Sequence, residues 1–190
     1  MKLIRNSKKF TLLKNFLILI TLLIACLFNT SCSSSFLFSQ DSVEITYRSP
    51  DRISFQGKGA GAGMALMSTM GPVGIALGVA IDEGIAKDIR SNAESSGIDF
   101  KSIFKQTVKQ SDQFKQAESI EVKQYGFVIK NGSKDYVAAE IHILVTQGGD
   151  VEQRKLSSWS EQQDLERWVT LDELKTDPDV IKELFLMALK

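Results

Sequence analysis

The residue types that usually perform catalysis are sparse in this sequence. His142 is the only histidine, and no motif places a serine or an acid beside it. The adjacent acids Asp82-Glu83 and Asp172-Glu173 would point about 100° apart on a helix, so neither pair forms a ready carboxylate dyad. The spacings typical of zinc proteases, serine hydrolases and calcium loops do not occur. The sequence therefore predicts a protein that is not an enzyme, with no catalytic residues, no metal and no cofactor.

A glycine-rich loop is the one alternative that would bind a nucleotide. Gly57-Lys58-Gly59-Ala60-Gly61-Ala62 matches G-x-G-x-x-A, placed after an expected strand and before a helix, where backbone N–H groups can hold a pyrophosphate. Two features argue against it: no parallel strand of convincing length is expected after the helix, and the Gly-Lys pair is not followed by Ser or Thr. An enzyme or nucleotide binder that uses Gly57–Gly63 is therefore a remote alternative.

Both cysteines of the chain lie near its N-terminus, behind a basic segment and an apolar run. Residues 1–25 hold five basic residues and no acid, and the apolar run extends from Phe16 to Phe28. This arrangement is typical of an export signal, with an uncleaved signal anchor as the alternative. No cysteine is left for a disulfide framework or a cysteine metal site in the folded part.

The segment Leu23-Ile24-Ala25-Cys26 resembles the lipobox of bacterial lipoproteins, in which a large aliphatic residue at −3 and a small one at −1 precede the cysteine that carries diacylglycerol. The resemblance implies lipidation at Cys26. Cys32 is the alternative, because Cys32-Ser33-Ser34-Ser35 resembles the polar tether after a lipidated cysteine. Asn29, at −3 from Cys32, departs from the pattern.

Removal of residues 1–25 changes the charge of the chain. It leaves 18 basic and 23 acidic side chains, a net charge of −5. An acidic body argues against nucleic acid as a partner and against broad electrostatic adhesion to anionic lipid.

The stretch Ala60–Ile81 contains 22 residues without a charge and is rich in Gly and Ala. Small residues four positions apart form a flat stripe on a helix and let another backbone approach closely. The residues expected to pack in this way are Gly59, Gly63, Gly74, Gly78, Ala76 and Ala80.

A straight helix of this length would reach about 33 Å. Met70-Gly71-Pro72 interrupts it, so a helical hairpin with arms near 60–70 and 73–90 fits equally well. Such a hairpin would be buried in the fold, laid into a membrane surface, or packed against other copies.

The remaining sequence predicts an α+β fold. Short strands are expected over 43–56 and an amphipathic helix from the N-cap Asp99 to about residue 117. Ser119–Lys130, Asp135–Gln147 and Val151–Trp159 alternate as strands around Asn131-Gly132 and Gly148-Gly149, which indicates an antiparallel meander of three or more strands. A bulge is expected near Lys123–Gln124. Two or more helices, among them Val180–Leu189, would cover its apolar face, and the Gly/Ala-rich helix or hairpin would precede it.

The expected organisation is a signal peptide over 1–25, a lipidated cysteine and Ser-rich linker over 26–42, strands and glycine zipper over 43–97, and an α+β domain over 98–190. Anchor and zipper resemble those of glycine-zipper-containing bacterial lipoproteins. That resemblance implies a lipid-anchored protein of the bacterial cell envelope, in the outer membrane and facing the periplasm.

Three functions remain open on the sequence. In the first, the zipper mediates self-association or membrane contact, and the α+β domain binds an envelope component. In the second, the zipper is internal core of a monomeric lipoprotein that acts as a binding or secretion-accessory module. The third is the enzyme or nucleotide binder named above. The partners expected are the membrane, through the N-terminal lipid, and either further copies of the chain or an envelope protein.

Overall fold

A computed structural model describes residues 43–130, 132–133 and 135–190 of the 190-residue chain. The expected signal peptide, Cys26, Cys32 and the Ser-rich linker lie outside these residues. The described elements, in chain order, are β1 (Glu44–Tyr47), β2 (Ser54–Gln56), α2 (Lys58–Met70), α3 (Pro72–Ser95), α4 (Phe100–Gln110), a 3-10 turn (Asp112–Phe114), β3 (Ser119–Ile129), β4 (Val137–Gln147), β5 (Asp150–Ser157), α5 (Trp159–Asp164), α6 (Leu171–Thr176) and α7 (Pro178–Ala188).

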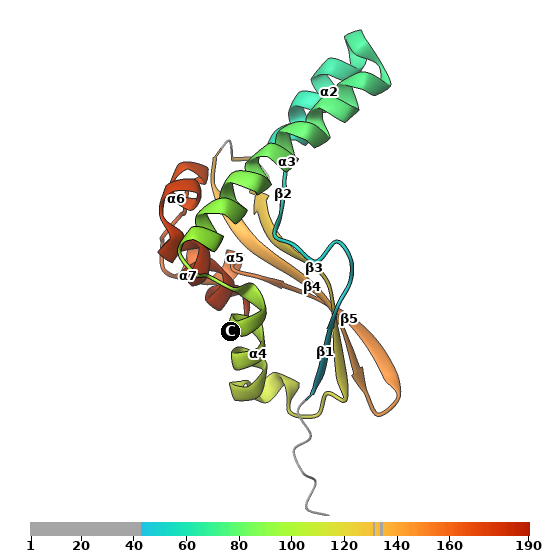
Figure 1. The fold of residues 1–190 in the computed structure, drawn as a ribbon, viewed down its shortest axis with the longest axis vertical. Helices are drawn as coiled ribbons and strands as arrows, with labels where there is room; N and C mark the ends of the chain where they lie inside the picture. The colour runs from blue at the N-terminus through green and yellow to red at the C-terminus, as the bar shows by residue number, and fades with distance from the viewer. Residues whose placement is uncertain (1–42, 131, 134) are drawn as a thin grey trace, which may run out of the picture. The chain divides into compact units, whose positions relative to one another are not determined.

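A mixed five-stranded sheet forms the centre of the fold, which confirms the predicted α+β class (Figure 1). Strands β3, β4 and β5 form the predicted antiparallel meander, and its register shifts between Val122 and Gln124, where a bulge was expected. β1 and β2 both pair with β3, and both run parallel to it. The short strands expected over 43–56 are therefore two strands added to β3, a partner about 70 residues away that local alternation does not indicate.

Helices cover one face of this sheet. On β4 the odd-numbered residues from Val137 to Val145 are buried, while Glu140 and His142 on the other face are partly exposed. The buried face packs against α4, α7 and the C-terminal half of α3. Aromatic rings fill the interior: Phe100 of α4 stacks on Tyr125 of β3 at 3.9 Å between centroids, and Phe185 of α7 lies 4.8 Å from Phe127.

Local sequence signals fix the ends of the covering helices. Asp99 caps α4, since its carboxylate accepts hydrogen bonds from the backbone N–H groups of Lys101 and Ser102. Asp177 caps α7 in the same way, with Pro178 at the first helical position. These caps set where the two helices begin.

The glycine-rich segment forms a helical hairpin, one of the two arrangements left open by the sequence. α2 and the first part of α3 lie side by side and extend beyond the sheet, as Figure 1 shows. Gly71, with φ +56°, forms the turn, and Pro72 starts α3. α3 then continues into the body, where Ala86, Ile89 and Ala93 are buried.

The expected boundary at residue 98 does not separate two compact units, because residues 43–190 all belong to one unit. Phe55 of β2 and Ile89 of α3 lie in the same core cluster as Phe127 of β3 and Phe185 of α7. The segment 43–97 thus contributes an edge of the sheet and part of its covering layer.

Candidate functional site

Four of the predicted zipper glycines face one another inside the hairpin. A Cβ atom added to Gly59 would lie 1.7 Å from the carbonyl oxygen of Gly78, and one added to Gly78 would lie 2.3 Å from the carbonyl oxygen of Gly59. A Cβ added to Gly63 would lie 3.2 Å from the Gly74 oxygen, and one added to Gly74 would lie 2.6 Å from the carbonyl carbon of Leu66. The glycine stripe therefore lets α2 and α3 of the same chain pack backbone against backbone.

Ala76 and Ala80 do not take part in this contact. Both are exposed, while Gly74 and Gly78, two residues before each, are buried. Positions two apart on a helix point about 200° from each other, so the alanines lie on the opposite side of α3. The second row of small residues predicted from the sequence therefore forms part of the outer surface.

Asp82 closes the base of the hairpin. Its carboxylate accepts hydrogen bonds from the backbone N–H groups of Gly57 at 3.1 Å and of Gly59 at 2.7 Å. These donors stand at the start of α2, where a carboxylate also satisfies free N–H groups of the helix end. From the sequence, Asp82 stood out only as one of two adjacent acids, although it is the first charge after Ala60–Ile81.

The same contact bears on the nucleotide-binding alternative. The sequence predicted no parallel strand of convincing length after the helix, and this prediction was wrong. β3, which has 11 residues and comes after the helical hairpin, pairs in parallel with β2. The loop nevertheless presents Gly57 and Gly59 N–H groups that are already bonded to Asp82. A phosphate at this position would compete with a carboxylate and meet its negative charge.

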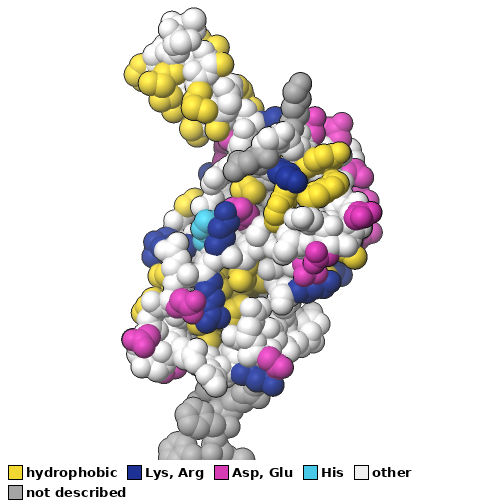
Figure 2. Space-filling model, turned by 180° about the vertical axis from the view of Figure 1, so that it is seen from behind, with side chains coloured by type: hydrophobic (Ala, Val, Ile, Leu, Met, Phe, Trp, Pro, Cys, Tyr) yellow, Lys and Arg dark blue, Asp and Glu magenta, His cyan; other side chains and the backbone are white. Residues whose placement is uncertain are grey.

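The outer surface of the hairpin is apolar. Eight large hydrophobic side chains there are exposed, by between 41 % and 71 %: Met64, Met67, Met70, Val73, Ile75, Leu77, Val79 and Ile81. Figure 2 shows hydrophobic side chains on the projecting end, whereas charged side chains are scattered over the body. Large contiguous apolar surfaces of this kind mark contact with a membrane or a protein.

The two hydroxyl side chains in this apolar region are bonded to their own helix. Ser68 donates to the carbonyl oxygen of Ala65 at 2.9 Å, and Thr69 donates to that of Leu66 at 3.1 Å. At the turn, the Gly71 N–H donates to the Met67 oxygen and the Gly74 N–H donates to the Gly71 oxygen. The tip therefore presents few unsatisfied donors.

Ion pairs lie at the hairpin base. Lys58 contacts Asp135 at 2.6 Å, and Glu83 contacts both Arg90 at 2.6 Å and Arg52 at 3.3 Å. The hydrogen bond from Arg90 lowers the pKa of the Glu83 carboxyl below its ordinary value. Charge thus begins abruptly where the apolar surface ends.

The other acids and the histidine singled out in the sequence are dispersed. His142 lies 3.6 Å from Glu140, which also contacts Lys155 at 2.6 Å on the open face of the sheet. Glu173 accepts a hydrogen bond from the Thr170 N–H in a capping box at the start of α6, and this bond lowers its pKa. Among the described residues no group of three or more His, Cys, Asp or Glu is placed to hold a metal.

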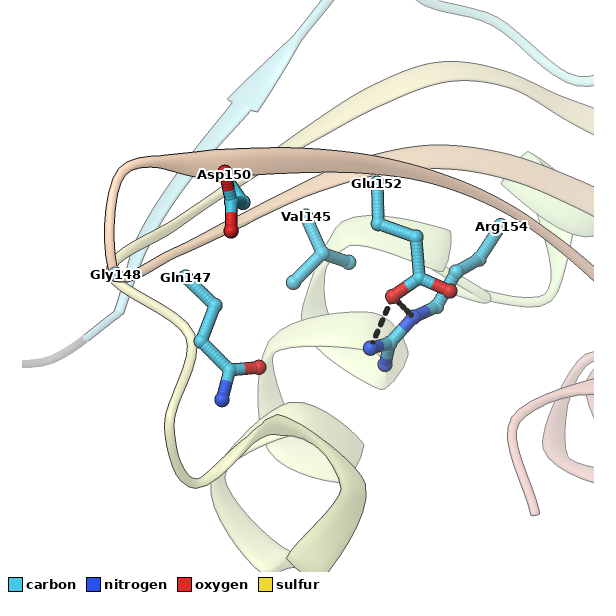
Figure 3. Close-up of a pocket in the computed structure, with 6 residues that line it drawn as sticks. All are labelled: Val145, Gln147, Gly148, Asp150, Glu152 and Arg154. Atoms are coloured by element: carbon cyan, nitrogen blue, oxygen red, sulfur yellow. Dashed lines mark hydrogen bonds and ion pairs between the residues drawn. The ribbon is translucent and has the colours of Figure 1, made fainter.

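A shallow hollow at the turn between β4 and β5 was not anticipated from the sequence (Figure 3). It has a volume of about 320 Å³ and is lined by Val145, Gln147, Gly148, Asp150, Glu152 and Arg154. Arg154 forms two hydrogen bonds with Glu152, at 2.8 and 2.6 Å, and these lower the pKa of the Glu152 carboxyl. The positive charge of Arg154 is therefore balanced by the Glu152 carboxylate. The hollow offers no unpaired positive charge to an anion.

An aromatic cluster surrounds Lys130, and no pattern in the sequence indicated it. The Lys130 ammonium lies 4.1 Å from the ring centroid of Trp159 and 4.0 Å from that of Trp168, which stacks in turn on Tyr136. These contacts join the end of β3 to the chain around α5 through cation–π attraction. Their residues are far apart in sequence, and no local motif announces them.

Comparisons with known proteins return no relative: no family model matches the chain, and neither curated proteins nor solved structures give a significant match. Within the described part of the chain, no helix has both the length and the apolar character needed to cross a membrane.

Proposed function

We propose that this chain is a non-enzymatic, lipid-anchored protein of the bacterial cell envelope whose glycine-closed hairpin mediates membrane contact or self-association. In this proposal Cys26 carries the lipid and the α+β body binds an envelope component. The observation that carries it is the exposure of eight large hydrophobic side chains on a projecting hairpin without a charge between Ala60 and Ile81.

The cost of leaving this surface in water supports the proposal. Burial of apolar surface contributes roughly 25 cal/mol per Å², and a fully buried Leu, Ile, Val or Met side chain about 1.5–3 kcal/mol relative to exposure. Eight such side chains, each at least 41 % exposed, represent a large unused driving force for association. The glycines do not consume it, because they pack on the inner side of the hairpin.

The second candidate is a monomeric lipoprotein with the zipper as internal core, acting as a binding or secretion-accessory module. The packing of Gly59 on Gly78 within one chain favours this reading of the glycines. It leaves the exposure of Met64 and Val79, at 71 % and 65 %, without a role. We therefore rank it second.

The anchor is tested by labelling cells with radioactive palmitate. The wild-type chain and Cys32→Ser are expected to incorporate label, and Cys26→Ser is not. The opposite pattern transfers the lipid to Cys32, while absence of label from the wild type rejects the lipoprotein proposal.

The association is tested in a lipid-free form, exported behind a cleavable signal that lacks a lipidation cysteine and carrying Cys32→Ser. With the hairpin intact, this form is expected to remain membrane-bound in carbonate or to crosslink to other copies. Combining Met64→Gln, Val73→Asn and Val79→Asn should abolish both behaviours. Val151→Asn is the matched control, since Val151 is 63 % exposed on β5 of the body. A protein that is released completely and stays monomeric with its hairpin intact would refute the association.

A further inference from the structure

We propose that the hairpin enters the hydrocarbon of a single bilayer leaflet, tip first, and stops at the Asp82 carboxylate. This inference rests on the proposed function and deepens it, because it names lipid acyl chains as the surroundings of the hairpin and fixes its depth.

The length of the uncharged arms matches one leaflet. Residues 60–70 and 72–81 each extend about 15 Å from the base to the turn at the helical rise of 1.5 Å per residue. The hydrocarbon core of a bilayer is about 30 Å thick, so one leaflet supplies about 15 Å. The turn at Gly71 would thus lie near the bilayer midplane with Asp82 near the headgroups.

Apolar side chains surround the hairpin rather than lining one side of it. Successive exposed residues on α3 are two positions apart, as in Ile75, Leu77 and Val79, and so point alternately to opposite sides. On α2, Met64 and Met67 are exposed as well, and the glycine side of each helix is turned inward. A partner seated in a groove needs one apolar face, whereas a surface that is apolar all round suits a surrounding apolar solvent.

Several polar groups of the tip are bonded within the hairpin. Ser68 and Thr69 donate to backbone carbonyls within α2, and Pro72 has no N–H to satisfy. The N–H groups of Gly71 and Gly74 are both used within the turn. Since an unsatisfied backbone group in lipid costs several kcal/mol, each of these bonds lowers the cost of placing the turn in hydrocarbon.

The charges at the base mark the limit of insertion. The Asp82 carboxylate is held by two backbone N–H groups, and Lys58 and Glu83 are paired with side chains of the body. The ion pairs at the base contain both positive and negative side chains. Entry of the hairpin into the leaflet therefore does not depend on attraction to anionic lipid. Deeper entry would take these groups out of water, at a cost of several kcal/mol for each ion.

Depth-dependent fluorescence quenching tests this inference on the full chain with Cys26→Ser and Cys32→Ser. One cysteine at a time is introduced by Met67→Cys, Ile81→Cys or Val151→Cys and labelled with an environment-sensitive fluorophore. The probe is a vesicle of phosphatidylethanolamine and phosphatidylglycerol with nitroxides either at the headgroup or deep in the acyl chains. Deep nitroxides should quench the label at 67 at least about twofold more than headgroup nitroxides, because a leaflet is about 15 Å deep. The order should reverse at 81, and neither should quench at 151.

A charge at the tip provides the matched comparison. Val73→Lys should remove the deep quenching of the label at 67, since a lysine near the bilayer centre disfavours insertion by roughly 100-fold. Val151→Lys, the same change on the body, should leave it intact, and circular dichroism checks that both variants keep their helices.

Three results would overturn the inference. One is a label at 67 that stays open to aqueous iodide when vesicles are present. Another is deep quenching that Val73→Lys does not change. The third is a blue shift at 67 that needs no vesicles and grows with protein concentration, which would show that a second copy covers the hairpin. That last result would leave the proposed function standing through self-association, whereas a hairpin that associates with nothing in cells removes both.

Discussion

Gly59 and Gly78 illustrate how two hydrogen atoms in place of side chains determine the geometry of an element. Each presents its Cα to the carbonyl oxygen of the other, so the backbones of α2 and α3 touch directly. Contacts of this kind give dispersion attraction at short range without the entropy cost of ordering a side chain. The rest of the apolar residues are thereby left to face outward.

Gly59→Ala is expected to loosen the hairpin, and Gly61→Ala is its matched control. The alanine methyl at 59 would overlap the Gly78 oxygen, so the helices must separate, at a cost of about 1–3 kcal/mol as in other overpacked sites. At Gly61 an added Cβ meets no described atom within 4 Å, and alanine should stabilise α2 by up to about 1 kcal/mol.

Amide hydrogen exchange across 58–82 measures both effects. Protection should fall for Gly59→Ala and rise for Gly61→Ala. Equal protection in the two variants would show that the close approach of Gly59 and Gly78 does not hold the arms together.

Tyr47 links the stability of the body to alkaline pH. Burial, with further contributions from the Asp51 and Asp99 carboxylates, raises its pKa from 10.0 to about 12. Its stabilising contribution is therefore complete below pH 10, where the phenol is neutral in both states. The free energy of unfolding should fall as pH rises from 10 to 12, because the unfolded chain releases the proton first.

Denaturant melts over this pH range test the effect, with Tyr47→Phe as the variant that lacks the titrating group. The variant should lose less stability between pH 10 and 12 than the wild type. Identical slopes would mean that Tyr47 is not the group responsible.

At the scale of elements, the two halves of α3 do different things. The first half packs with α2 and is exposed on its outer side, while Ala86, Ile89 and Ala93 in the second half are buried against the body. Asp82 stands between them and bonds the Gly57 and Gly59 N–H groups. The hairpin is thus an addition to the body rather than part of its core.

Replacing residues 60–81 by a short Gly/Ser turn should therefore leave the body folded. The ends to be joined are close, since the Gly59 N–H donates to Asp82 at 2.7 Å, and Asp82 would become the N-cap of the shortened α3. The melting temperature is expected to change by less than about 4 °C, the shift that roughly 1 kcal/mol produces in a domain of this size.

Ile89→Ala supplies the comparison on the same helix. Ile89 is completely buried, and removing its side chain should cost about 2–5 kcal/mol and lower the melting temperature clearly. If excision of the hairpin lowers the melting temperature as much as Ile89→Ala does, the hairpin is part of the core after all.

Elements defined by local patterns were predictable from the sequence. Asn131-Gly132 and the alternation in β3 and β4 indicated the meander, and Asp99 marked the start of α4. Elements defined by distant partners were not. The parallel pairing of β1 and β2 with β3 has no local signature, and so the domain boundary was placed at residue 98, inside one compact unit.

For the candidate site, the composition of the sequence identified the Gly/Ala-rich segment, and the structure identified the exposed apolar surface of the hairpin. Periodicity identified Gly59, Gly63, Gly74 and Gly78 as packing residues but could not distinguish packing within the chain from packing between chains. Because Ala76 and Ala80 repeat the same spacing, the sequence also could not separate the inner side of α3 from the outer. Only the folded arrangement shows which side is covered.

At the scale of the whole molecule, the attachment of β1 and β2 to β3 depends on contacts between residues far apart in the chain. Arg48 beside β1 bonds Glu121 of β3, 73 residues later, and Gln124 of β3 donates to Ser54 of β2, 70 residues earlier. The hairpin and the meander contain mostly local contacts, so each can form early, whereas these loops must close across the intervening chain. β1 and β2 can therefore pair only once β3 is present, and this pairing ties the N-terminal part of the body to the meander.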